Sequence, residues 1–174
     1  MAGSLGHCSI AIAERAPTLH FIVQERPEVV AKGEEQLPEL QNEQIRDRIK
    51  FQVHDMFTPQ PVKGASVYLL RFILHDHPDM GAIEILQNLV PALQNGSRII
   101  VMDGVMPEPN VLPKSEERIM RIMDLEMMTT FNAKERERAD WEALFYAADA
   151  RLKLKGVVRP EGSAQSVMEI VFEE

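Results

Sequence analysis

The sequence predicts an α/β fold with a mostly parallel sheet, helices on both faces and one antiparallel strand at the C-terminal end. Short apolar runs alternate along the chain with segments of helical spacing, which is typical of a parallel sheet. Only a tight turn separates the last two runs, 151–158 and 166–172, so they are expected to form an antiparallel hairpin. The 174 residues suffice for one domain with a sizeable core.

The chain is expected to begin with a glycine-containing turn, 3–9, and a helix that Pro17 ends. A strand follows at 19–23, one or two helices lie within 28–47, and a second strand covers 49–54. In a βαβ unit the glycine turn normally follows a strand. We therefore expect the first strand of the sheet to be missing.

The apolar run 67–74 predicts a strand buried on both faces. It ends in His75, Asp76 and His77, and a helix is expected at 81–90. Three titratable side chains thus stand at the C-terminal end of a strand, which is the edge where open α/β sheets bind ligands. The alternative is that His75 only satisfies the backbone of a loop.

Another strand is expected at 97–102, directly before Asp103. Helical spacing then covers 115–130 and 136–150. Because neighbouring parallel strands end at the same edge of a sheet, Asp103 is expected beside His75.

The glycine turn, its helix and Glu25 match the pattern of a nucleotide-binding βαβ unit. Such a turn lets a ligand approach the backbone of Gly3 and Gly6. Glu25 ends the following strand, where these units place an acid that accepts both ribose hydroxyls. The alternative is an exposed loop glutamate.

Composition and charge exclude several classes of protein. The net charge of −8 argues against a nucleic-acid ligand, and no apolar run is long enough to cross a membrane. The start of the chain lacks the basic region of a signal peptide. Cys8 is the only cysteine, which suits a reducing compartment, so we expect a cytoplasmic protein without a disulfide. We expect no metal site.

The segment Leu74-His75-Asp76-His77-Pro78-Asp79 resembles the LHDWxD signature of class I S-adenosylmethionine-dependent O-methyltransferases, which act on small hydroxylated aromatics. Further motifs occur in the family's order, and residues 59–68 resemble fungal secondary-metabolite members. These motifs are Gly3-Ser-Leu-Gly-His (VDVGGGxGH), Phe21-Ile-Val-Gln-Glu25 (FxVQD), His54-Asp55-Met56-Phe57 (GDMF or HDFF), Asn132-Ala-Lys-Glu-Arg136 (NxKER) and the following Trp141-Leu144 helix.

The resemblance implies a Rossmann-like catalytic domain, 1–174, that is truncated at its N-terminus. Family members are homodimers, and the N-terminal domain that makes the dimer is expected to be absent. The implied enzyme transfers a methyl group from S-adenosylmethionine to a phenolic hydroxyl of a small secondary metabolite. His75 maps to the general base, and Asp103 and Glu135 map to the acids that orient its ring.

The resemblance also assigns residues to the cofactor and to the acceptor. Those assigned to the cofactor are Gly3 and Gly6 at the methionine end, Glu25 at the ribose, and Asp55, Met56, Arg71 and His77 at the adenine. His77 departs from the family, which has a tryptophan there. Those assigned to the acceptor pocket are Met123, Met127, Met128 and Asn132, and thioethers adapt well to flat rings.

Two other functions stay open. Some relatives use bound S-adenosylmethionine as a fixed positive charge for ring-forming, pericyclase-like reactions. A chain that lacks a central strand could instead be a non-catalytic remnant that accepts a strand from a partner protein.

Overall fold

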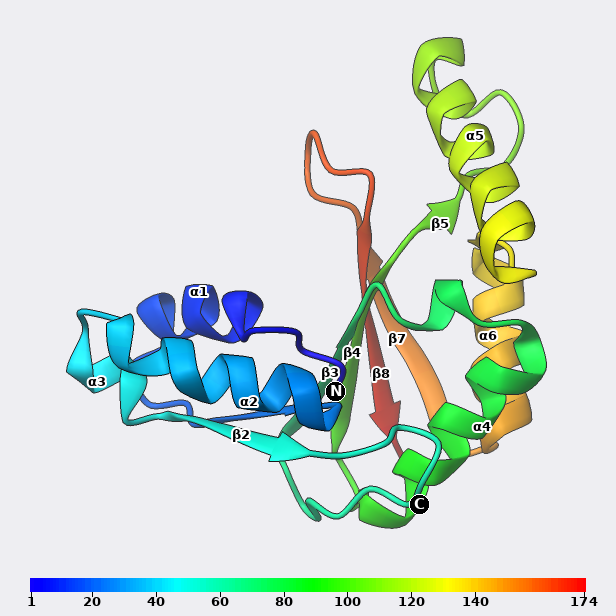
Figure 1. Ribbon diagram of the computed structural model, residues 1–174. Helices are drawn as coiled ribbons and strands as arrows, with labels where there is room; N and C mark the ends of the chain where they lie inside the picture. Colours follow the sequence, from blue (N-terminus) through cyan, green and yellow to red (C-terminus); the bar gives the residue numbers. More distant parts are fainter. The chain divides into compact units, whose positions relative to one another are not determined.

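The computed structural model describes residues 1–174, which divide into two compact units, unit 1 (Met1–Thr58) and unit 2 (Pro59–Glu174). None of its helices combines the length and the apolar character that crossing a membrane requires. The elements of unit 1 are α1 (His7–Arg15), β1 (Phe21–Glu25), α2 (Pro27–Gln36), the 3₁₀ helix η1 (Leu37–Glu39), α3 (Glu43–Arg46) and β2 (Ile49–Val53) (Figure 1).

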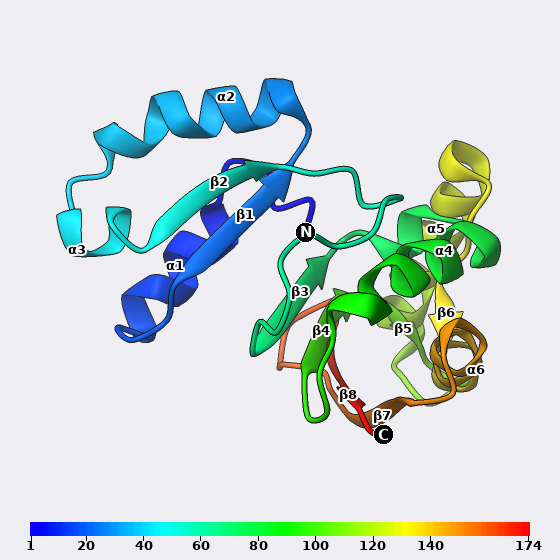
Figure 2. The same cartoon turned by 90° about the horizontal axis from the view of Figure 1, so that it is seen from below.

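Unit 1 is a two-stranded parallel sheet with helices packed on one face. β1 and β2 run side by side in Figure 2 and pair from Phe21 opposite Ile49 onwards. Ala13 of α1 and Val23 of β1 are buried in the same small core as Ile49. A Cβ at Gly33 in α2 would overlap the ring of Phe51, so glycine is what allows this helix to lie close to β2.

Unit 2 contains the remaining elements. They are β3 (Val67–Arg71), the 3₁₀ helix η2 (Leu74–Asp76), α4 (Asp79–Leu89), the 3₁₀ helix η3 (Val90–Ala92), β4 (Arg98–Asp103), β5 (Val105–Met106), α5 (Lys114–Phe131), β6 (Arg136–Glu137), α6 (Arg138–Ala148), β7 (Leu152–Val158) and β8 (Ser166–Phe172).

The main sheet of unit 2 has the strand order β3-β4-β8-β7. β3 and β4 are parallel, whereas β8 is antiparallel to both β4 and β7. α4 and α6 lie together beside this sheet in Figures 1 and 2. Their buried side chains and those of the strands form the core, including Leu86, Trp141, Phe145, Val101 and Ile170. The predicted α/β fold with one antiparallel strand near the C-terminus is confirmed.

The predicted strand 67–74 is wrong in its length and in its burial. β3 ends at Arg71, because Phe72 has a φ of +55° and turns the chain out of the extended conformation. Leu74 and His75 then form part of η2. Only alternate residues of β3 are buried, and 48% of Val67 is exposed. One face of β3 therefore packs on the core of unit 2 and the other does not.

The predicted start of the helix 136–150 is also wrong. Arg136 and Glu137 form β6, which pairs in parallel with Val105 and Met106 of β5, and the helix begins only at Arg138. The first predicted strand, 19–23, lies two residues later in the chain as β1. Glu25 is the last residue of β1, so it lies at the end of this strand as predicted.

β1 and β3 each have a strand partner on one side only. β1 pairs with β2, and β3 pairs with β4. Residues 1–6, which precede α1, form no strand, although the Gly3 amide donates to the carbonyl of Gln24 in β1 at 3.2 Å. β1 and β3 are therefore both edge strands of their sheets.

Candidate active site

His75 is buried within η2, immediately after the turn that ends β3. Its Nδ1 lies 3.0 Å from Oε1 of Glu135, which is hydrogen-bonding distance. Its Nε2 lies 3.4 Å from Oδ1 of Asp76. The ring of Phe72 packs against the imidazole with a centroid distance of 5.5 Å. The imidazole is thus hydrogen-bonded to Glu135 through Nδ1, and its Nε2 faces the Asp76 carboxylate at a longer distance.

Glu135 is positioned by its backbone and by a glycine. The amide of Glu135 donates to Oδ1 of Asp124 in α5 at 2.8 Å. Its carboxylate lies against Gly104, where a Cβ would overlap Oε2. Oε2 is itself buried and has no hydrogen-bond partner in the protein. A side chain at position 104 would therefore force the Glu135 carboxylate to move.

Asp103, the last residue of β4, lies at the same edge but makes no hydrogen bond to His75. It is fully buried, and neither of its carboxylate oxygens has a donor with hydrogen-bond geometry. Burial is the main reason that the pKa of Asp103 is raised to about 6, and the negative charge of Glu135 adds to this rise. The charge of the His75 ring and the backbone amides of Phe72 and His75 oppose the rise. Glu135 therefore holds the ring by a hydrogen bond, whereas Asp103 lies close enough for its charge to raise the pKa of His75.

The charges around His75 favour its protonated form. Burial by itself would lower the pKa of His75. The hydrogen bond to Glu135 and the charges of Asp103, Glu135 and Asp76 outweigh that effect and raise the pKa above its usual value. A histidine that has taken up a proton is therefore stabilised at this position, which is what a general base requires.

Replacing Asp103 with asparagine is expected to remove a loss of stability that the wild type suffers as the pH rises, so that the variant gains on the wild type over this range. The folded-state pKa of Asp103 is about 6 and its ordinary value is 3.8. Between these values the unfolded chain releases the proton first, so the wild-type free energy of unfolding falls as the pH rises. Asparagine does not titrate, and the difference of about two pKa units corresponds to about 3 kcal/mol above pH ~6. Denaturant unfolding at about pH 4 and pH 7.5 measures this gain, and a pH-independent difference between the two proteins would contradict the account.

The glycine turn and Glu25 come together in unit 1. Oε1 of Glu25 accepts from the amide of Ser4 at 3.1 Å, and Oε2 accepts from the amide of Arg26 at 3.0 Å. Each carboxylate oxygen can accept a second hydrogen bond. Gly6, with a φ of +82°, is the N-cap of α1, and no side chain caps this helix. The residues thus fit the ribose and the charged amino-acid end of the predicted cofactor.

The residues assigned to the adenine lie in both units. In unit 1, Asp55 follows β2, and its Oδ1 accepts from the amide of Phe57 at 3.0 Å. Met56 beside it is half-buried. In unit 2, the Arg71 guanidinium lies 4.5 Å from the centroid of the Phe72 ring, and His77 caps the C-terminus of η2. Contact of these residues with an adenine stays a prediction.

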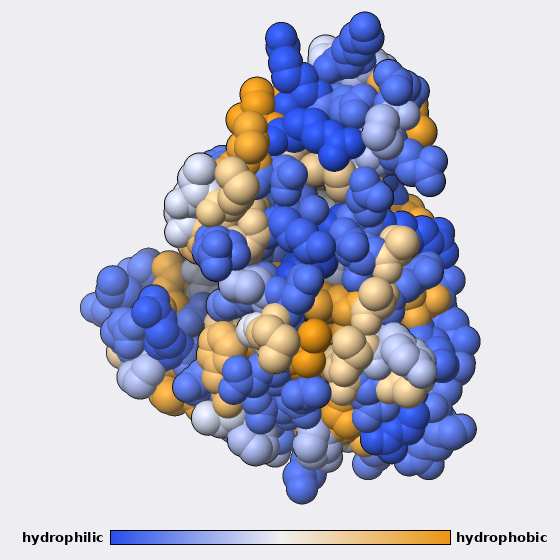
Figure 3. Space-filling model, turned by 90° about the vertical axis from the view of Figure 1, so that its right-hand side faces the viewer, coloured by the Kyte–Doolittle hydropathy of each residue, from blue (hydrophilic) through white to orange (hydrophobic).

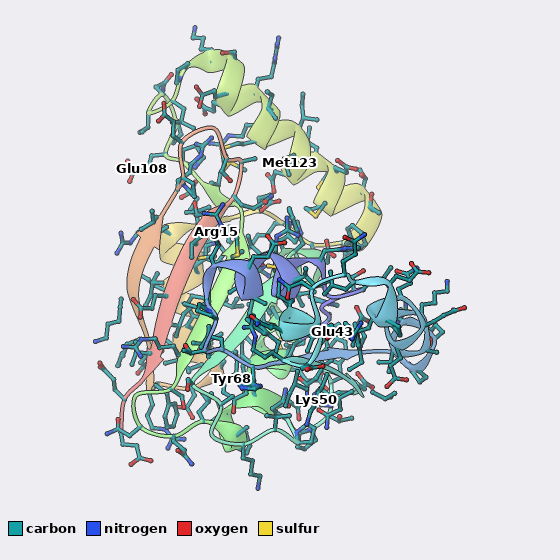
Figure 4. All side chains as sticks on the ribbon, turned by 90° about the vertical axis from the view of Figure 1, so that its left-hand side faces the viewer. Arg15, Glu43, Lys50, Tyr68, Glu108 and Met123 are labelled. Carbon is teal, nitrogen blue, oxygen red and sulfur yellow. The ribbon has the colours of Figure 1, made fainter.

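The methionines assigned to the acceptor pocket differ in their surroundings. Met123 of α5, labelled in Figure 4, lines a small hollow beside Glu135 and Gly104. Met127 is buried, whereas 56% of Met128 is exposed. Asn132, with a φ of +54°, ends α5. Met123 therefore lies near Glu135 of the His75 site. Other apolar residues of α5 are also exposed, among them Ile119, Ile122 and Leu125. Figure 3 shows that hydrophobic residues reach one face of the molecule among hydrophilic ones.

Two residues around the site were not predicted. Phe72 packs on the His75 ring, and the fully buried Arg136 binds the turn that contains it. A signal for Arg136 is present in the sequence, because it follows Glu135 directly in the NxKER-like segment. The strained backbone of Phe72 has no such signal, since phenylalanine is a common strand residue.

Known proteins resemble this chain in sequence and in structure. A family model of the O-methyltransferase domain matches residues 1–150. O-methyltransferase pgmB of Aspergillus terreus is 47% identical over 171 residues, which cover 98% of this chain and 48% of that protein. The solved structure of LepI in complex with SAM has a TM-score of 0.84 and 35% identity, and the match covers 99% of this chain and 42% of LepI. A structure described as a pericyclic reaction enzyme matches with the same values. The chain thus spans about half the length of the curated relatives that it matches.

Proposed function

The chain belongs to the O-methyltransferase domain family, and from this premise we propose that it transfers a methyl group from S-adenosylmethionine to a phenolic hydroxyl of a small aromatic metabolite. The observation that carries the proposal is the buried pair formed by His75 and Glu135, whose Nδ1 and Oε1 atoms are 3.0 Å apart. Residues 1–174 would supply the base and the acid that orients it.

His75 would act as the general base through Nε2. When Nδ1–H donates to the Glu135 carboxylate, Nε2 keeps its lone pair and can accept the phenolic proton. The bound cofactor supplies a methyl group on a positively charged sulfur. Nε2 of His75 would take the phenolic proton, so that the phenolic oxygen is free to accept the methyl group that the cofactor would supply. Glu135, Asp103 and Asp76 would stabilise the imidazolium that results.

Glu25 would hold the ribose of the cofactor, and replacing it with alanine is expected to weaken cofactor binding. The loss of hydrogen bonds to a charged acceptor costs about 1.5–3 kcal/mol, or roughly 10- to 100-fold in affinity. Calorimetric titration of S-adenosylhomocysteine measures this change. Glu28→Ala is the matched control, because Glu28 is an exposed glutamate in the same segment that pairs only with Arg26. Equal affinities of the two variants would contradict the assignment of Glu25.

The proposed activity is tested by incubating the 174-residue chain with S-adenosylmethionine and a panel of phenols: phenol, catechol, resorcinol and 1-naphthol. Formation of a methyl ether together with an equal amount of S-adenosylhomocysteine supports the proposal. If S-adenosylhomocysteine binds in a saturable way but no acceptor is methylated, the transfer function is wrong for this chain.

A second candidate is a cofactor-binding enzyme that catalyses a ring-forming reaction without methyl transfer. Its support is the likeness to a pericyclic reaction enzyme, at 35% identity, together with His77 where the O-methyltransferase family has tryptophan. Such a reaction does not consume its cofactor, so the two functions differ in whether S-adenosylhomocysteine accumulates with turnover. The hydrogen-bonded His75–Glu135 pair favours methyl transfer, because that reaction needs a base.

A further inference from the structure

Arg136 binds the turn that carries His75. Its Nη1 donates to the carbonyl of Leu74 at 2.9 Å, and its Nη2 donates to the carbonyl of His77 at 2.8 Å. These two carbonyls stand on either side of His75 in the chain. Its Nε also donates to Oδ1 of Asp79, the first residue of α4, at 2.9 Å. One guanidinium thus connects both ends of the His75 turn to the start of the next helix.

Arg136 is itself firmly held. It is fully buried, and its guanidinium carbon lies 5.1 Å from the centroid of the Trp141 ring. The indole of Trp141 donates through Nε1 to the carbonyl of Gly104 at 3.0 Å. The backbone of Arg136 pairs with Val105 in the short β5–β6 sheet. Arg136 is therefore held by residues that lie at, or bind to, the C-terminal end of β4.

From these contacts we propose that Arg136 is a positioning residue that fixes His75 for proton transfer. Glu135 binds the imidazole ring, and its neighbour Arg136 binds the backbone on both sides of the same histidine. The consecutive residues Glu135 and Arg136 thus fix the orientation of the His75 ring and the position of its backbone. This inference rests on the proposed role of His75 as the base, and Arg136 itself touches neither substrate nor cofactor in it.

The geometry requires arginine rather than lysine. A guanidinium is a planar fork that can donate to two carbonyls and a carboxylate at once, whereas an ammonium is a compact point charge on a flexible stem. With lysine at 136 the turn would lose at least one of its anchors. The Nδ1–Oε1 hydrogen bond would then weaken, and because burial would still act on the imidazole, the pKa of His75 would fall.

Arg136→Lys tests the inference with two readouts. We expect kcat for methyl transfer to fall by about 10- to 100-fold, with the affinity for S-adenosylhomocysteine changed by less than about twofold. We also expect the pKa of His75, followed by NMR of its Cε1 proton and assigned with His75→Gln, to fall below the wild-type value. Arg138→Lys is the control, because Arg138 is an exposed arginine that pairs only with Glu142.

A merely structural role would lower the melting temperature of Arg136→Lys but leave the pKa of His75 and kcat unchanged, and that result would overturn the inference. If Arg136→Lys does not fold, Asp79→Ala replaces it. This variant keeps both carbonyl contacts but removes the partly exposed carboxylate that binds Nε, so a smaller fall in the pKa of His75 is expected. An unchanged pKa there would equally overturn the inference. The NMR readout needs no acceptor, so failure of the proposed function, seen as activity that survives His75→Gln, is a separate result.

Discussion

Replacing His75 with glutamine is expected to lower kcat by about 10²–10⁴-fold. Glutamine has a similar reach and can hydrogen-bond to Glu135, but its amide cannot take up a proton at neutral pH. The phenol would then have to lose its proton to water. The rate of S-adenosylhomocysteine formation at saturating cofactor and acceptor measures this effect, and the affinity for S-adenosylhomocysteine should stay within about twofold of the wild-type value.

His20→Gln is the control for this variant, because His20 is exposed and lies just before β1. A His75→Gln protein that binds S-adenosylhomocysteine normally and still methylates the phenol at the wild-type rate would show that His75 is not the base.

Replacing Glu135 with glutamine is expected to lower kcat by about 10²–10⁴-fold as well, although it changes only one atom of the side chain. A carboxylate can only accept the hydrogen bond from Nδ1, and this keeps the proton off Nε2. An amide can donate to Nδ1 instead, so that the proton moves to Nε2 and the lone pair needed by the phenol is lost. An exchange of acid for amide behind a catalytic histidine has an effect of about 10⁴-fold in serine proteases.

The imidazole nitrogen shifts of Glu135→Gln distinguish this account from a simple loss of stability. The neutral form of His75 should carry its proton on Nδ1 in the wild type and on Nε2 in the variant. Glu137→Gln, two positions along the chain and exposed, is the control. If Glu135→Gln folds and retains wild-type kcat, then Glu135 does not select the tautomer of the base.

Local sequence patterns predicted the glycine turn and the acid at the end of β1. Gly6 takes a positive φ at the turn, and Glu25 lies at a strand end, both of which depend on neighbours close in the chain. The closing antiparallel strand could be predicted for the same reason, since the turn at 160–163 leaves the hairpin no other pairing direction.

The rest of the site depends on contacts between residues far apart in the sequence. The apolar run around Phe72 has strand propensity, but its turn is set by the elements packed around it, which override propensity. Arg136 lies in a charged stretch that has the composition of a helix. Its backbone nevertheless pairs with β5, and its side chain binds a carbonyl of the His75 turn, so it lies in a strand. Asp103 and Glu135 were both expected to orient His75. Only the side-chain positions in the structure show that Glu135 makes the hydrogen bond and Asp103 does not.

The central claim, that His75 removes the phenolic proton, is tested most directly by the rate of methyl transfer as a function of pH at saturating cofactor and acceptor. Because the base must be unprotonated and the pKa of His75 is raised, the rate should fall as the pH drops, with a midpoint above the ordinary histidine value of 6.5 and a plateau on the alkaline side. A rate that continues to rise about tenfold for each pH unit through the alkaline range, without a plateau, would mean that the acceptor ionises without His75.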